Sequence, residues 1–197
     1  MITTIIFDLS EVYLQGIVGS HGKLEKILGF QVDPEYFYNE AFDHFMLGQI
    51  TEETYLKTVI DRHGWDIAVD ILKTAVRKNF IEIHGTRKII EQLKQKGYTL
   101  VLLSNQGKEW GEYCESQYAY HTLFDHVVYS YEVHLAKPSK DIFTHVLTTL
   151  KLNPEECLFI DDNIKNITAA RHLKITALQF TNSEELKASL RKFNISL

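Results

Sequence analysis

The alternation of strand and helix patterns from residue 84 onward is the feature that most restricts the fold of this chain. Short apolar segments of strand length alternate there with segments in which apolar residues recur at helical spacing. The predicted strands cover residues 98–103, 126–129, 157–160 and 176–180. The predicted helices cover residues 86–96, 108–118, 139–150, 163–173 and 183–192. This alternation is typical of an α/β doubly wound, Rossmann-like fold, in which helices cover both faces of a parallel sheet.

The N-terminal segment predicts one more strand of this sheet. Residues 2–7 are almost entirely apolar or β-branched, which is the pattern of a parallel strand that is buried on both faces. The apolar run stops at Asp8. A carboxylate at the carboxyl end of a central strand lies where α/β sheets bind ligands, although an aspartate can also simply end a strand or cap a turn.

A run of helices without intervening strands follows the first strand. The helices are predicted within residues 20–29, 34–49, 51–64 and 66–80, with Thr51 as an N-cap. The apolar positions that we expect to face inward in the first and last of them are Leu24, Ile27, Leu28, Ile67, Ile71, Leu72, Ala75 and Val76. We therefore predict a four-helix cap domain at 15–83, inserted into an α/β core domain formed by 1–14 and 84–197.

Composition excludes several classes of protein. A net charge of −5 disfavours a general nucleic-acid binder, which normally carries a basic face. Cys114 and Cys157 are far apart and lack metal-ligand spacing, so neither a disulfide framework nor a zinc site is expected. No charged leader with an apolar segment and no membrane-length apolar run is present, which favours a cytoplasmic protein without a membrane partner.

Polar residues follow the predicted strands where each strand ends. Asp8, the pair Ser104-Asn105 and the pair Asp161-Asp162 would converge, because the carboxyl ends of parallel strands share one edge of the sheet. Lys137 precedes the helix that leads into the strand at 157–160. Carboxylates suit Mg²⁺, whereas a serine hydroxyl and a lysine ammonium suit phosphoryl oxygens. A carboxylate at such a site can act as a nucleophile and form an aspartyl-phosphate.

Each of these residues also has an ordinary structural interpretation. Asp161-Asp162 could be the N-cap of the helix that follows, and Lys137 alone could be a solvated surface lysine. Phe37, Phe42 and Phe45 are better explained as packing residues of the inserted helices than as a substrate box. The order of the charged motifs along the chain favours a site over these separate explanations.

The motifs FDLSEV, LLSN, AKP and FIDDN resemble, in order and spacing, the four motifs of the haloacid dehalogenase superfamily of hydrolases. The inserted helices resemble the cap that many members carry after the first motif. The segments FMLGQITEETY and FIDDNIKNITAARHLKI are most similar to the sugar-1-phosphate phosphatase-like subgroup. The resemblance implies a Mg²⁺-dependent phosphatase that acts on a small phosphorylated metabolite, a sugar phosphate among the candidates, and that is a monomer or homodimer.

The resemblance also implies roles for individual residues. Asp8 would be the nucleophile and a metal ligand, and Ser10 would offer its backbone carbonyl to the metal. Asp162 would bind the metal directly, while Asp161 would bind or orient its waters and Lys137. The residues expected to bind phosphate are Ser104, Asn105 and Lys137, of which Lys137 also neutralises the nucleophile. Asn166, one helical turn beyond Asp162, would support that loop.

One position departs from the family pattern. Ser10 stands where most members have a second aspartate that serves as general acid and base, a function worth about 10²–10⁴ in rate. Glu11 and His44 are the candidate replacements, and the sugar-phosphatase subgroup also lacks this aspartate. Ser10 therefore keeps open a non-catalytic phosphate- or metal-binding regulatory protein on the same fold.

A 2-haloacid dehalogenase is the remaining alternative, in which Asp8 would attack carbon without a metal. Such enzymes do not need the Asp161-Asp162 pair. They are also expected to carry an arginine near the first motif, and none lies between Asp8 and Arg62. The sequence disfavours this alternative.

Overall fold

A five-stranded parallel sheet forms the centre of the molecule in the computed structural model, which describes residues 1–195 and 197. The strands are β1 (Thr4–Phe7), β2 (Thr99–Ser104), β3 (His126–Tyr129), β4 (Cys157–Asp161) and β5 (Thr176–Gln179). Their order in the sheet is β3-β2-β1-β4-β5. This confirms the predicted α/β parallel fold. β1 lies at the centre of the sheet, and all four of its residues are buried. Its almost entirely apolar or β-branched sequence predicts such a strand.

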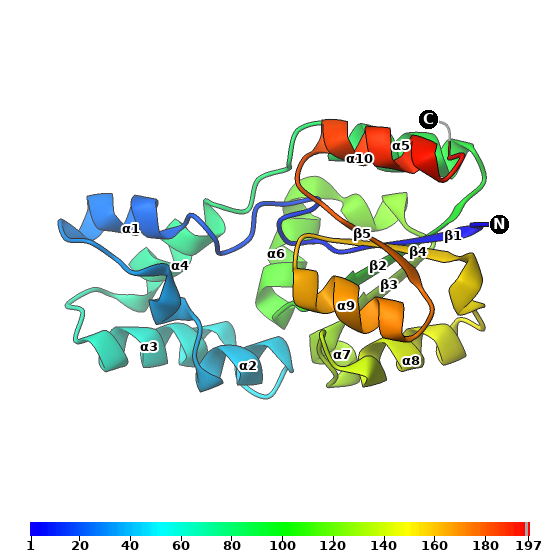
Figure 1. Cartoon of the computed structure of the whole chain (residues 1–197). Coiled ribbons are helices and arrows are strands. Elements are labelled where there is room, and N and C mark those ends of the chain that lie inside the picture. The colour runs from blue at the N-terminus through cyan, green and yellow to red at the C-terminus, as the bar shows by residue number, and fades with distance from the viewer. Residues whose placement is uncertain (196) are drawn as a thin grey trace.

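Helices cover both faces of the sheet (Figure 1). One face carries α5 (Thr86–Gln95), α6 (Lys108–Tyr118) and α10 (Ser183–Lys192), which share an apolar core with Ile5 and Phe7. The other carries α8 (Lys140–Thr149) and α9 (Ile164–His172), which pack on Ile6 and Phe159. Because successive side chains of a strand point to opposite faces, β1 supplies both cores.

Four α-helices lie between β1 and α5 in the chain and to one side of the sheet in Figure 1. They are α1 (His21–Leu28), α2 (Glu40–Met46), α3 (Glu52–His63) and α4 (Val69–Arg77). Thr51 accepts a hydrogen bond from the Thr54 amide at 3.2 Å, which confirms it as the N-cap of α3. From this placement we infer that residues 15–83 form the inserted domain predicted from the sequence.

Local structure within the inserted helices differs from the prediction at several points. Residues 34–49 were expected to form one helix, but the chain forms a 3₁₀ helix, η1 (Pro34–Phe37), and then α2. Asn39 between them is extended and accepts a hydrogen bond from the Phe42 amide at 3.1 Å, so a new helix begins there. Ile27 and Ile71, expected to face inward, are 51% and 44% exposed, because both line a shallow groove between α1 and α4.

Short elements around the sheet were also not predicted. These are α7 (Ser130–Val133) and the 3₁₀ helices η2 (Tyr120–Leu123) and η3 (Pro154–Glu156). Pro138 was expected to open the helix that follows it, but Ser139 is the N-cap of α8 and accepts a hydrogen bond from the Asp141 amide at 3.2 Å.

Across the described residues, no helix combines the length and the apolar character that crossing a bilayer requires.

A buried carboxylate connects the inserted helices to the core. Glu52, the first residue of α3, is only 1% exposed. It accepts hydrogen bonds from Arg77 Nε of α4 at 3.0 Å and from Trp110 Nε1 of α6 at 2.8 Å. Because the guanidinium and the indole both satisfy this buried charge, Glu52 fixes α3 and α4 against α6.

We expect Gly107→Ala to destabilise the contact between α2 and α6. A β-carbon at residue 107 would overlap the ring of Phe45 at Cζ, so the ring or the helix must move. Such overpacking typically costs about 1–3 kcal/mol, which urea unfolding would measure.

Gly22→Ala is the matched control, because a β-carbon there meets nothing within 4 Å. It lies inside α1, where alanine is the better helix former, so the control should be neutral or stabilising. Equal effects of the two substitutions would contradict the packing argument.

Candidate active site

Three strand ends bring the candidate side chains together at the carboxyl edge of the sheet. Asp8 directly follows β1, Ser104 ends β2 and Asp161 ends β4. The Asp8 amide donates to the Ile160 carbonyl at 2.9 Å, which extends the β1–β4 pairing to the aspartate. Asp8, Ser104 and Asp161 are all buried. The sheet register therefore places the two carboxylates side by side.

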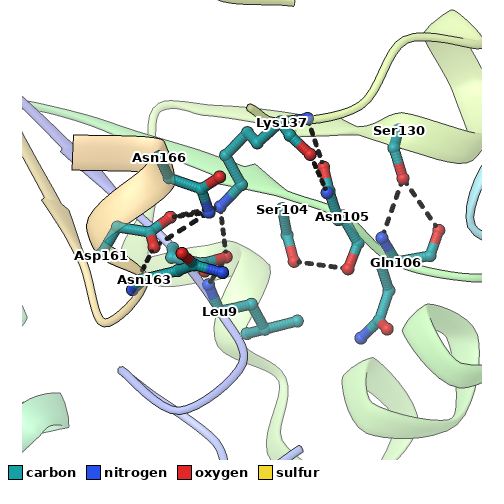
Figure 2. A network of polar contacts seen from close by, with 10 residues as sticks. Leu9, Ser104, Asn105, Gln106, Ser130, Lys137, Asp161, Asn163 and Asn166 are labelled. Carbon is teal, nitrogen blue, oxygen red and sulfur yellow. Dashed lines mark hydrogen bonds and ion pairs between the residues drawn. The ribbon is translucent and has the colours of Figure 1, made fainter. Parts of the chain in front are cut away.

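Lys137 lies between those two carboxylates. Its Nζ is 2.8 Å from Asp8 Oδ1 and 2.7 Å from Asp161 Oδ2. The loop that carries Lys137 is held by Asn105, whose side-chain oxygen accepts from the Lys137 amide and whose Nδ2 donates to the Lys137 carbonyl, both at 2.8 Å (Figure 2). The loop after β2 thus positions the lysine through its backbone.

Asp161 is further held by the start of α9. It accepts hydrogen bonds from the Asn163 amide at 2.8 Å and from Nδ2 of Asn166, which lies 3.0 Å from both carboxylate oxygens (Figure 2). The N-cap of α9 is Asn163 and not the aspartate pair, so the capping interpretation of Asp161-Asp162 is wrong. Asn166 was expected to support the loop around Asp162, and it contacts Asp161 directly through these hydrogen bonds.

The electrostatics of this cluster favour an added cation. Burial raises the pKa of Asp8 well above its usual 3.8, and the Lys137 ammonium opposes this effect. Burial lowers the pKa of Lys137, but the Asp8 and Asp161 carboxylates outweigh it and the net shift is upward. Burial and the Asp161 charge also raise the pKa of Asp162. One ammonium thus faces three carboxylates.

The geometry of the three carboxylates fits a hard divalent ion. One oxygen each from Asp8, Asp161 and Asp162 lie within 4.8 Å of one another. Oxygen ligands of this kind and charge suit Mg²⁺, which also keeps several waters. An ion there would offset the excess negative charge, so the residues present fit the metal that the sequence implies.

A cavity of about 180 Å³ opens over the cluster. Among the predicted site residues, those that line it are Asp8, Ser10, Asn105, Lys137, Asp162 and Asn166. Ser104 and Asp161 lie behind this surface and are fully buried. The Ser104 hydroxyl makes only a weak contact of 3.5 Å, with the Asn105 carbonyl.

The two suggested replacements for the missing aspartate are placed differently. Glu11 lines the cavity, and its Oε1 accepts a hydrogen bond from the Gly16 amide at 2.7 Å. His44 is exposed, lies 3.9 Å from Glu40 of the same helix and is not among the cavity-lining residues. The geometry brings Glu11 to the site and leaves His44 outside it.

Other lining residues were not identified as site residues from the sequence. Gln106, which lines the cavity, directly follows Ser104-Asn105 in the same loop, so its position next to the motif could have indicated a site residue. Tyr38, Phe42 and Trp110 also line the cavity, and of these three the sequence analysis interpreted only Phe42, as a packing residue. Phe42 packs against Tyr55 and Trp110 as expected and lines the cavity as well.

Comparison with known proteins identifies a family and several relatives. The family described as haloacid dehalogenase-like hydrolase matches residues 5–180. The D-ribitol-5-phosphate phosphatase of Bacteroides thetaiotaomicron is 23% identical over 96% of this chain and 97% of its own length. A crystal structure of a HAD family enzyme from the same organism, in complex with magnesium and inorganic phosphate, superposes with a TM-score of 0.82. It is 23% identical, and the match covers 97% of this chain and 100% of that one.

Some curated relatives are much longer than this chain. Drimenol cyclase drtB of Aspergillus calidoustus is 25% identical over 96% of this chain, but the match spans only 36% of that protein. Two further relatives are matched over 23% and 19% of their lengths. The functions of those whole proteins therefore do not transfer directly.

We expect Lys137→Met to destabilise the protein in the absence of divalent ions. The substitution leaves the buried carboxylates of Asp8 and Asp161 without their counter-charge, a loss that typically costs about 3–5 kcal/mol. Urea unfolding in EDTA at neutral pH measures the difference. Lys140→Met is the control, because Lys140 is exposed, and its effect should stay within about 0.5 kcal/mol. Similar losses in both variants would refute the role given to the buried ammonium.

Proposed function

Because this chain belongs to the haloacid dehalogenase-like hydrolase family, we propose that it is a Mg²⁺-dependent phosphatase that hydrolyses the phosphate monoester of a small metabolite. The observation that carries the proposal is the cluster in which Lys137 Nζ contacts Asp8 at 2.8 Å and Asp161 at 2.7 Å beside a third carboxylate, Asp162. A structural ion pair alone would not explain the third carboxylate and the cavity above it. A sugar phosphate remains the finer prediction for the metabolite.

Asp8 is the proposed nucleophile. Its Oδ1 accepts hydrogen bonds from the Leu9 amide at 2.7 Å and from Lys137, and these two contacts fix the direction of the carboxylate. A carboxylate oxygen of Asp8 forms a bond to phosphorus while the bond from phosphorus to the alcohol oxygen breaks. Water then hydrolyses the aspartyl-phosphate, which releases phosphate and regenerates Asp8.

The surrounding residues stabilise negative charge during this transfer. Lys137 neutralises both Asp8 and the incoming phosphoryl oxygens, and the Ser104 hydroxyl binds one of them. Asn105 acts by holding the Lys137 backbone, because both polar atoms of its side chain are engaged there. Asp8, Asp162 and the Ser10 carbonyl would hold Mg²⁺, with Asp161 at its waters; the bound ion reduces the repulsion between nucleophile and substrate.

The first experiment is hydrolysis of p-nitrophenyl phosphate with Mg²⁺ and with EDTA. We expect turnover that requires Mg²⁺ and is lost in Asp8→Asn, because the amide is not a nucleophile. Asp43→Asn is the matched control, since Asp43 lies on the exposed surface of α2 and should retain full activity. If wild type and Asp8→Asn are equally inactive on a broad panel of phosphates but bind phosphate, the non-catalytic alternative replaces this proposal.

We also expect turnover to depend strongly on the leaving group. Ser10 lines the cavity beside Asp8, and its hydroxyl is a poor proton donor near neutral pH. Alkyl phosphates should therefore react much more slowly than p-nitrophenyl phosphate. Ser10→Asp should raise kcat for alkyl phosphates by about 10²-fold, within the range of general acid catalysis, and change p-nitrophenyl phosphate turnover less. Equal effects on both substrates would show that proton donation is not limiting.

A further inference from the structure

We propose that the cavity selects an uncharged leaving group that carries a hydroxyl, which Gln106 binds, and that it rejects substrates with a second anionic group. This inference rests on the proposed phosphatase function and specifies its substrate class: the monophosphate of a neutral, hydroxyl-bearing alcohol. Phosphorylated acids and bisphosphates are the excluded classes.

The charges around the cavity argue against a second anion. Among the described residues that line it, Lys137 is the one basic side chain, and it already contacts Asp8 and Asp161. The acidic lining residues are Asp8, Glu11 and Asp162. A carboxylate or second phosphate on the leaving group would therefore enter the cavity without a counter-charge and close to negative charge, which is costly.

One wall of the cavity is aromatic and uncharged. It is formed chiefly by Tyr38, Phe42 and Trp110, with the Phe42 ring centroid 5.2 Å from that of Tyr38 and 6.4 Å from that of Trp110. The Trp110 N–H is already donated to Glu52, so the indole offers only apolar surface to a ligand. Burial raises the pKa of the Cys114 thiol to about 12, so this lining residue is also neutral. Such rings pack against the C–H surface of an uncharged carbon skeleton.

Gln106 is a nearly buried polar residue of the cavity that the catalytic cluster does not use. It is only 4% exposed, and its backbone amide donates to Ser130 Oγ at 2.9 Å. Its side-chain amide has no hydrogen-bond partner among the described residues, and in Figure 2 it points away from the Asp161–Lys137 pair. A nearly buried amide at a cavity gains most from a ligand group that can both donate and accept, as a hydroxyl does.

The loop position of Gln106 is fixed independently of its side chain. Ser130 Oγ accepts from the Gln106 amide and donates to the Met46 carbonyl of α2 at 2.5 Å. Substitution of the Gln106 side chain therefore keeps the backbone contacts and changes mainly what the cavity offers to a ligand.

A matched series of primary alkyl phosphates tests the inference. The probes are n-butyl phosphate, 4-hydroxybutyl phosphate, 4-phosphooxybutanoate and 4-aminobutyl phosphate, whose leaving alcohols are similar in reactivity. We expect kcat/KM for the hydroxylated probe to exceed that for the carboxylate by about tenfold or more, since an unpaired charge costs at least 1.4 kcal/mol. Faster turnover of the carboxylate or of the amine than of the hydroxylated probe would overturn the inference.

Two substitutions test the residues that carry it. Gln106→Met should lower kcat/KM for 4-hydroxybutyl phosphate about tenfold more than for n-butyl phosphate, since only the former loses a hydrogen bond to the amide. Tyr38→Arg adds a cation at the wall and should raise the relative rate with 4-phosphooxybutanoate. Tyr36→Arg is the control, because Tyr36 stacks on His63 away from the cavity and should leave the preference unchanged.

The outcomes separate this inference from the proposed function. If p-nitrophenyl phosphate and every alkyl phosphate fail to react in the wild type, the phosphatase proposal fails and the substrate class fails with it. If p-nitrophenyl phosphate is hydrolysed but Gln106→Met affects the hydroxylated and plain probes equally, only the role of Gln106 is refuted.

Discussion

The contact of one buried ammonium with two buried carboxylates is the interaction on which the arrangement of this molecule depends. Asp8 and Asp161 end adjacent parallel strands, and the register that aligns β1 with β4 brings their charges together. Without Lys137 between them, the centre of the sheet edge would carry unopposed negative charge in a poorly hydrated place. The same charge excess that needs the lysine also makes the edge suitable for a divalent ion and a phosphoryl group.

The sheet could be predicted from the sequence because its strands are buried on both faces. The apolar runs that precede Asp8, Ser104 and Asp161 left few alternatives, and the alternation with helices fixed a parallel arrangement. Strand and helix ends were correct within one or two residues across most of the core. The chain order of the motifs was therefore enough to predict which residues meet at the sheet edge.

The inserted helices could be predicted less well, because their sides are not uniformly covered. Ile27 and Ile71 have the spacing of core residues but line an open groove, and the break at Asn39 depends on a local side-chain hydrogen bond. The sequence places Gln106 next to the Ser104-Asn105 motif, but its proposed role could not be predicted, since that role depends on the missing hydrogen-bond partner of its side-chain amide. Helical periodicity reports which residues share a face, but it does not report what that face meets.

The reciprocal hydrogen bonds between Asn105 and Lys137 use only the backbone of the lysine. The Asn105 side chain therefore fixes the position of residue 137, whereas the positive charge there comes from the lysine side chain itself. Different side chains thus determine the position of residue 137 and the charge that it carries. A substitution at residue 137 therefore removes the charge from the sheet edge but leaves in place the backbone hydrogen bonds that hold the loop.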